Sequence, residues 1–136
     1  MPLQVNECFK DLGHGAKAPE GYQKITAHLV YDVKHDGRAK SCYVCVGHRM
    51  PVPVESVYSS VVSLQGTQLL TFIAEEQGLE VWSTNIGNAY LESFAQEKVY
   101  IKAGPKFRDH KGHILIISKA LYGLKSSGLR WSEQVF

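Results

Sequence analysis

The stretch that decides the fold of this chain runs from Leu79 to Ser93 and reads Leu-Glu-Val-Trp-Ser-Thr-Asn-Ile-Gly-Asn-Ala-Tyr-Leu-Glu-Ser. Its first part, residues 79–84, has the apolar character of a short buried strand. Gly87 and Asn88 predict a turn, and residues 89–91 continue as a helix-like segment. A strand that ends in polar side chains before a tight turn is a common framework for a functional site. We therefore expect a site at this turn.

The composition suits one globular domain. The chain has 136 residues, 44% of them apolar, and a net charge of +2, which is weak evidence for or against a nucleic-acid partner. No run approaches the roughly 18 apolar residues that a membrane helix needs, and the N-terminus has no signal-peptide pattern. We expect no membrane association and an intracellular, cytoplasmic location. Cys8, Cys42 and Cys45 are odd in number, and we interpret them as reduced thiols.

A β-hairpin is predicted near the start of the chain. Residues 1–24 combine several glycines with isolated apolar residues, which predicts a loosely ordered lead-in. From residue 25 to residue 33 apolar and polar residues largely alternate, as in a half-buried strand. Asp36-Gly37 predicts a tight turn, and residues 39–46 then form the returning strand.

The remainder of the chain mixes helices with strands. Ser63 is the predicted N-cap of a helix that ends at Gly78. An apolar stripe on this helix is predicted to pack into the core and consists of Leu69, Leu70, Ile73 and Ala74. Strands are expected over residues 97–102 and 113–118, and Ser127 is expected to cap a last helix that starts near Gly128. This pattern predicts an α+β fold.

Two groups of residues have the spacing of metal ligands. Cys42, Cys45 and His48 are each three residues apart. Structural zinc usually takes four ligands, no fourth is near, and strand residues three apart face opposite sides of a sheet. His110 and His113 lie in a predicted polar loop, and we interpret them as solvated. We therefore predict no metal site.

Four stretches carry a resemblance to a known family. Residues 85–91 fit Asp-(Ile/Val)-x-x-Ala-(Phe/Tyr)-Leu except at the first position, and residues 58–63 read Tyr-Ser-Ser-Val-Val-Ser. Residues 97–101 read Glu-Lys-Val-Tyr-Ile, and residues 119–131 contain Lys-Ala-Leu-Tyr-Gly-Leu-Lys-Ser-Ser and end in Trp. Together these stretches resemble copia-type retrotransposon reverse transcriptases, which are RNA-directed DNA polymerases. The resemblance covers residues 25–136 and implies a partial right-hand polymerase fold, with the fingers β-hairpin and the first half of the palm.

The resemblance also implies a catalytic position that has changed. The family places at position 85 the first of three aspartates that hold two Mg²⁺ ions, and this chain has Asn85. The other two belong to a Tyr-x-Asp-Asp hairpin that we expect beyond Phe136, and the sequence contains no Asp-Asp pair. We therefore expect this chain to bind no Mg²⁺ and to be catalytically inactive.

Further positions are assigned by the same resemblance. Cys42 stands where the family has an Arg over the nucleotide triphosphate, beside Lys40, which matches. Tyr90 matches an aromatic residue beneath the sugar of the nucleotide, although simple packing at a helix start is an equal alternative. Gly123, Lys125 and Arg38 are the expected contacts to template and primer, with a solvated hairpin as the alternative for Arg38.

Three interpretations follow from these matches. In the first, the chain is a truncated, inactive fragment of a reverse transcriptase. In the second, it is a non-catalytic nucleic-acid-binding module that keeps contacts to an RNA template or an RNA–DNA hybrid. In the third, it is one piece of a longer polyprotein whose remainder is its partner.

Overall fold

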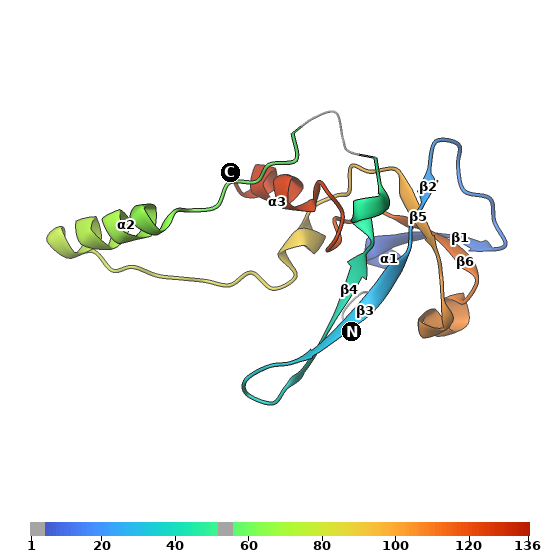
Figure 1. Ribbon diagram of the computed structural model, residues 1–136, viewed down its shortest axis with the longest axis horizontal. Coiled ribbons are helices and arrows are strands. Elements are labelled where there is room, and N and C mark those ends of the chain that lie inside the picture. Colours follow the sequence, from blue (N-terminus) through green and yellow to red (C-terminus); the bar gives the residue numbers. More distant parts are fainter. Residues whose placement is uncertain (1–4, 52–55) are drawn as a thin grey trace.

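The computed structural model describes residues 5–51 and 56–136, and the fold is mixed α+β, as predicted (Figure 1). The elements follow in the order α1 (Val5–Cys8), β1 (Phe9–His14), β2 (Gln23–Lys24), β3 (Ala27–Val33), β4 (Ala39–Cys45), η1 (Gly47–Arg49), α2 (Leu64–Glu76), η2 (Ala89–Glu92), β5 (Val99–Lys102), η3 (Pro105–His110), β6 (His113–Ile117) and α3 (Ser127–Val135), where η marks a 3₁₀ helix.

A four-stranded sheet forms the body of the molecule, in the order β1-β6-β5-β2. Strand β6 is antiparallel to both of its neighbours, and the short β2 runs parallel to β5. The predicted strands over residues 97–102 and 113–118 are confirmed as β5 and β6. Because β6 is central and carries Ile-Leu-Ile-Ile, its Leu115 is fully buried.

The loosely ordered lead-in predicted for residues 1–24 is wrong over residues 9–14. These residues form β1 and pair with β6, and Cys8 and Phe9 are each only 3% exposed. The sequence does not predict this strand because Lys10, Asp11 and Gly13 interrupt the apolar pattern. Pairing with β6, rather than local propensity, specifies it. Residues 1–4 of the predicted lead-in lie outside the described part of the chain.

The predicted hairpin is confirmed as β3 and β4. Its register runs from Ala27 opposite Cys45 to Val33 opposite Ala39, and Gly37 takes the positive φ of +79° that the turn requires. Only the base of the hairpin is buried. There the Tyr43 ring packs edge-on against the rings of Phe9 and Phe107, at centroid distances of 6.3 and 5.7 Å.

Helix α2 is confirmed, but its place in the fold differs from the prediction. Ser63 caps it, since the Ser63 Oγ accepts a hydrogen bond of 3.0 Å from the Gly66 backbone N–H. The helix extends away from the sheet and forms an arm together with the returning residues 79–86 (Figure 1). The predicted core stripe is therefore solvent-exposed at Leu69, Leu70 and Ile73, and only Ala74 is buried.

The short buried strand predicted for residues 79–84 does not form. These residues are in extended coil, and the Trp82 side chain is 85% exposed. Within the described residues no strand pairs with this segment to accept its backbone hydrogen bonds. Its residues 79–82 line a small hollow together with α2. The turn after it is confirmed, with Asn88 in the left-handed conformation at φ +53° and η2 immediately following.

The last helix starts one residue earlier than predicted. Ser127 is its first residue rather than its cap, because the Ser127 Oγ instead donates to the Leu121 carbonyl oxygen at 2.7 Å. The Ser126 side chain makes no capping bond, and the Glu97 carboxylate accepts from the Ser126 backbone N–H at 2.9 Å. All three cysteines are free, as expected. None of the helices in the described ranges is both long and apolar enough to cross a membrane.

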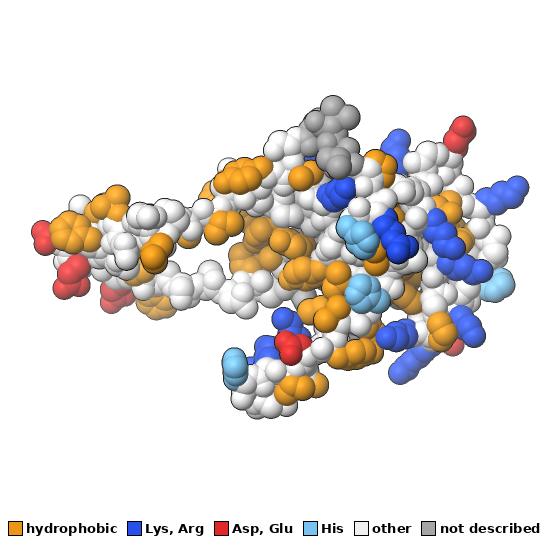
Figure 2. Space-filling view, in the orientation of Figure 1, with side chains coloured by type: hydrophobic (Ala, Val, Ile, Leu, Met, Phe, Trp, Pro, Cys, Tyr) orange, Lys and Arg blue, Asp and Glu red, His pale blue; other side chains and the backbone are white. Residues whose placement is uncertain are grey.

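Charge is unevenly divided along the chain. All 15 Lys and Arg residues lie in residues 1–49 and 98–136, together with seven Asp and Glu residues. Residues 50–97 contain six Glu residues and no Lys or Arg. Figure 2 shows the outcome on one face, with basic side chains over the sheet and hairpin and acidic side chains at the far end of the arm. The net charge of +2 hides this division.

Candidate functional site

The hairpin base and the segment around Tyr122 meet at the centre of the candidate site. Val44 and Tyr122 form an isolated parallel bridge, and the Cys45 backbone N–H donates to the Tyr122 carbonyl oxygen at 2.7 Å. Burial and the nearby Glu97 raise the pKa of Cys45 to about 12, so this thiol stays protonated at neutral pH. The two backbones are in close contact at Gly123.

Gly123 is required by this approach. Its φ is +92°, which favours glycine, and an added Cβ would overlap the backbone carbonyl of Cys45. Gly47 faces the same contact from the other side, since a Cβ there would overlap the Gly123 carbonyl. These glycines allow the hairpin to cross the segment that carries Tyr122 and Lys125.

Tyr90 and Lys125 are both held against this crossing. The Tyr90 ring lies on the Tyr122 ring, with centroids 4.8 Å apart and planes tilted by 45°. The Lys125 ammonium donates to the Met50 carbonyl oxygen at 2.6 Å and is partly buried. The structure thus brings Tyr90, Gly123 and Lys125 together around Tyr122.

The three candidate residues on the hairpin lie further along β4 and its turn. Arg38 forms an ion pair of 2.6 Å with Asp36 at the tip, and both side chains are largely exposed. Lys40 is exposed opposite Asp32, and Cys42 is half-buried opposite Val30. Lys40 and Cys42 are two residues apart on one strand, so they share a face.

Asn85 stands apart from the other candidates. It is exposed, and it lies in the coil that leads from the arm to the turn at Asn88. Its amide is neutral. In the described part of the chain, Asp11, His110 and His113 are close enough together to hold a metal, and Asn85 is not among them. A single neutral amide oxygen at Asn85 does not fit a Mg²⁺ ion, which prefers several charged oxygen ligands.

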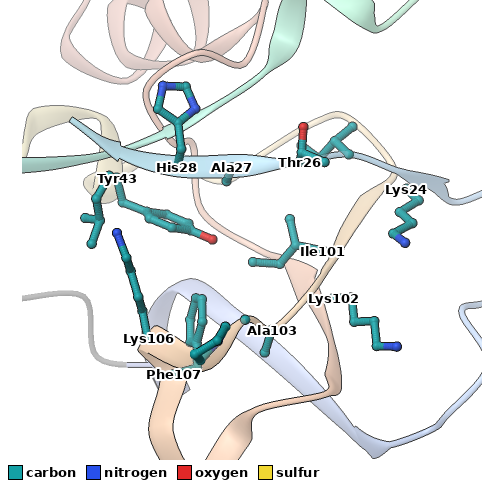
Figure 3. A pocket seen from close by; sticks show the side chains of 14 residues that line it. Lys24, Thr26, Ala27, His28, Tyr43, Ile101, Lys102, Ala103, Lys106 and Phe107 are labelled. Atoms are coloured by element: carbon teal, nitrogen blue, oxygen red, sulfur yellow. The ribbon is translucent and has the colours of Figure 1, made fainter.

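A pocket that sequence reasoning missed lies between the hairpin base and the sheet (Figure 3). Its volume is about 470 Å³, and its walls include the half-buried Tyr43 and the buried Ile101. Burial raises the pKa of Tyr43 to about 12. Lys24, Lys102 and Lys106 also line the pocket. Lys24 is far from Lys102 and Lys106 in the sequence, so no local motif indicates this basic pocket.

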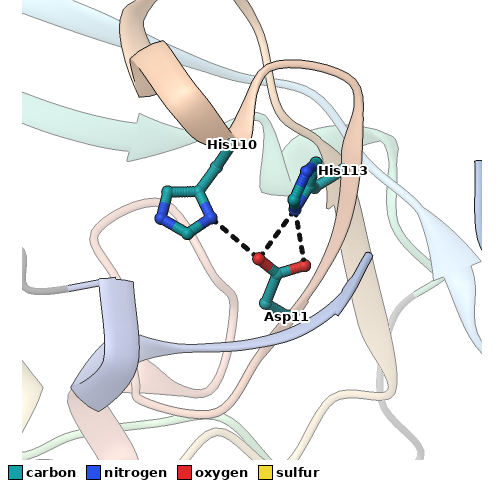
Figure 4. A group of neighbouring side chains, drawn as sticks. All are labelled: Asp11, His110 and His113. Carbon is teal, nitrogen blue, oxygen red and sulfur yellow. Dashed lines mark hydrogen bonds and ion pairs between the residues drawn. The ribbon is translucent and has the colours of Figure 1, made fainter. Parts of the chain in front are cut away.

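The interpretation of His110 and His113 as solvated loop residues is wrong. Both imidazoles lie against the Asp11 carboxylate (Figure 4), with His110 Nδ1 and His113 Nδ1 each 2.8 Å from its Oδ2. The His113 hydrogen bond is the largest cause that lowers the pKa of Asp11 to about 2. Asp11 is about a hundred residues away in the sequence, so a spacing of three could not reveal it.

Comparison with known proteins identifies the family. The family described as reverse transcriptase (RNA-dependent DNA polymerase) matches residues 14–136, which is most of the chain. The chain belongs to this family. Its relatives are retrotransposon polyproteins, so this reverse transcriptase domain is of the copia type, as the sequence predicted.

The similar proteins are much longer than this reverse transcriptase domain. The Pol polyprotein of transposon TNT 1-94 from Nicotiana tabacum is 25% identical over 138 residues, covering 95% of this chain and 10% of that polyprotein. The transposon Ty1-DR5 Gag-Pol polyprotein of Saccharomyces cerevisiae is 26% identical, covering 98% of this chain and 8% of its own length. The chain thus spans about a tenth of these relatives. No solved structure matches it.

Proposed function

We propose that this chain is a catalytically silent segment of a copia-type reverse transcriptase, formed by the fingers hairpin and the first half of the palm of a right-hand polymerase. The supporting elements are the β3–β4 hairpin for the fingers, and α2, η2, β5 and β6 for the palm. In the same proposal the domain acts inside the cell, in the cytoplasm, and the remainder of a polyprotein is its partner.

The observation that carries this proposal is Asn85. By family resemblance this position holds a carboxylate that binds the catalytic Mg²⁺ ions, and an amide supplies one neutral oxygen instead. We expect the exchange to remove several kcal/mol of transition-state stabilisation, about a thousandfold or more in rate. Cys42 adds to the loss, because a thiol cannot make the paired, charge-assisted hydrogen bonds that an Arg makes to phosphate.

Retained binding of an RNA template or an RNA–DNA hybrid is the second candidate function. The charge division favours it, since every Lys and Arg lies outside residues 50–97. Lys40 and Arg38 are exposed on the hairpin, and Gly123 and Lys125 lie at the crossing beneath it. Tyr90 would then face the sugar of a bound nucleotide from its place on Tyr122. Contacts of basic residues to phosphates bind without sequence preference.

Primer extension tests the catalytic proposal. The chain and an Asn85→Asp variant are each joined to a palm completion that carries an Asp-Asp hairpin, and Mg²⁺-dependent extension is measured on an RNA template. We expect extension only from the Asn85→Asp variant, because it restores the missing charge. Asn88→Asp is the matched control, since it adds the same charge three residues away, in the turn, and we expect no extension from it.

Two results would contradict the proposal. The first is extension by the unchanged Asn85 chain at a rate within tenfold of the Asn85→Asp variant. The second is no extension by either protein although both bind an RNA–DNA hybrid. In that case the loss of catalysis would involve Cys42 and other positions as well as Asn85, and nucleic-acid binding would be the better account of the function.

A further inference from the structure

Three potential metal ligands converge where β1, η3 and β6 meet. Asp11 lies on β1, His110 ends η3, and His113 begins β6 (Figure 4). The register of β1 against β6 shifts between Asp11 and His14, so β1 contains an extra residue at this point. This bulge lets Asp11 lie beside His113 although its partner in the register is Leu115.

The loop that carries His110 is closed at its base. The Ala103 backbone N–H donates to the His113 carbonyl oxygen at 2.9 Å, and the Gly112 N–H donates to the Ala103 carbonyl oxygen at 2.8 Å. Asp11 is held from its own strand, because the Gly13 N–H donates to its Oδ1 at 2.7 Å. The backbone therefore positions all three ligands without any contribution from a bound ion.

Both imidazole nitrogens face the Asp11 carboxylate. His113 Nδ1 is 3.0 Å from Asp11 Oδ1 and 2.8 Å from Oδ2, and His110 Nδ1 is also 2.8 Å from Oδ2. An ionised carboxylate only accepts hydrogen bonds, so each Nδ1 carries a proton in these contacts. A metal ion can take the place of both protons, because a neutral imidazole can carry its proton on Nε2 instead.

The chemistry of these donors favours Zn²⁺ over Mg²⁺. Two imidazole nitrogens and one carboxylate oxygen suit Zn²⁺, whereas Mg²⁺ prefers oxygen ligands alone. Bonds of about 2.0 to 2.2 Å place tetrahedral donors roughly 3.3 Å apart. The three ligand atoms lie within 4.8 Å of one another, so modest side-chain rotation is enough to surround an ion.

The site is also accessible. The side chains of Asp11, His110 and His113 are 26%, 39% and 23% exposed, which leaves a path for an ion and room for a water molecule. We propose that Asp11, His110 and His113 bind one Zn²⁺ ion, with water as the fourth ligand. This site is independent of the proposed polymerase chemistry, and the ion ties β1 and η3 to the central strand β6.

Zinc titration of the complete chain tests the proposal. The protein is stripped with a chelator, and Zn²⁺ binding is then measured by competition with a chromophoric chelator. We expect one high-affinity ion per chain, tetrahedral absorption bands when Co²⁺ replaces Zn²⁺, and a higher unfolding temperature with Zn²⁺ present. His110→Ala and His113→Ala should each weaken Zn²⁺ binding by at least about tenfold. Loss of a residue that only supports a metal ligand already weakens binding by about that factor, so loss of a ligand should cost at least as much.

His14→Gln is the matched control. His14 lies opposite His113 in the β1–β6 register, with ring centroids 6.1 Å apart, but its nitrogens are outside the converging set. We expect it to leave Zn²⁺ affinity unchanged. Asp11→Asn covers the case in which a histidine variant does not fold, because Asn can still accept hydrogen bonds from the imidazoles but lacks the charge. The proposal would be overturned if Asp11→Asn bound Zn²⁺ as tightly as the unchanged chain. Binding in a ratio other than one ion per chain would also overturn it, as would a loss of Zn²⁺ affinity in His14→Gln as large as in the histidine-ligand variants.

Discussion

Single residues in this domain divide into those that hold the fold and those assigned to chemistry. Gly123 belongs to the first group, because its φ of +92° and its contact with the Cys45 backbone leave no space for a side chain. Lys125 donates to the Met50 carbonyl, so its ammonium already has a structural partner. Asn85 and Lys40 are exposed. Their environment leaves them free for a function outside the fold.

The first stability prediction concerns Gly123→Ala. We expect it to lower the free energy of unfolding by at least about 3 kcal/mol, because strain at positive φ adds to the displacement of the Cys45 backbone, which an added Cβ would overlap. Urea unfolding followed by fluorescence measures the loss. Gly104→Ala is the control, since Gly104 has φ of −84° and open space around its Cβ position. An equal effect of the two substitutions would contradict the assigned role of the crossing.

Among the elements, α2 is the one that depends least on the body. Three of its apolar side chains line a hollow of about 230 Å³ together with the returning residues 79–82. Phe72 is 63% exposed. Short helices that lack tertiary packing are marginal in water. The N-cap therefore contributes a larger share of the stability of α2 than it would for a helix packed against the core.

The second stability prediction follows for Ser63→Ala. We expect loss of about 1 kcal/mol from the local stability of α2, because the bond from the Gly66 N–H to Ser63 Oγ is removed. Amide hydrogen exchange should accelerate within α2 by roughly fivefold, while the urea midpoint of the body stays the same.

Ser126→Ala is the matched control for the cap. Ser126 precedes α3 in the same way, but its Oγ is buried without a hydrogen-bond partner. Its replacement should leave hydrogen exchange in α3 unchanged. A lowered urea midpoint of the whole domain in Ser63→Ala would show instead that α2 is part of the cooperative core.

Sequence reasoning succeeded for elements whose signals are local. The hairpin turn at Gly37, the cap at Ser63 and strands β5 and β6 all follow from neighbouring residues. It failed where a distant partner decides the outcome: β1 forms because β6 is beside it, and residues 79–84 stay in coil because no described strand is beside them. For the same reason Asp11 and its two histidines could not be connected from spacing alone.

At the scale of the whole molecule, the basic body and the acidic arm determine which partners can approach. A positive surface attracts the phosphates of nucleic acids, and the attraction weakens as salt competes for them. The arm carries Glu75, Glu76 and Glu80 without a nearby basic residue. A nucleic acid should therefore contact the hairpin and the sheet rather than α2.

The last prediction tests this orientation with an RNA–DNA hybrid. We expect the affinity to fall steeply between low and physiological salt, and Lys40→Ala to reduce the slope of log affinity against log salt by about one. Glu76→Gln on the arm is the control and should change neither quantity. Fluorescence anisotropy gives both values. Affinity that does not depend on salt, or an equal effect of Glu76→Gln, would contradict binding through the hairpin.

The close contact between Gly47 and Gly123 is required by the fold and does not depend on the polymerase reaction. An element that no longer copies itself loses selection on its reaction, but any protein it still produces must fold to avoid degradation. Under the proposed loss of a carboxylate at position 85, the Tyr-Gly-Leu-Lys run around Gly123 can persist for structural reasons alone.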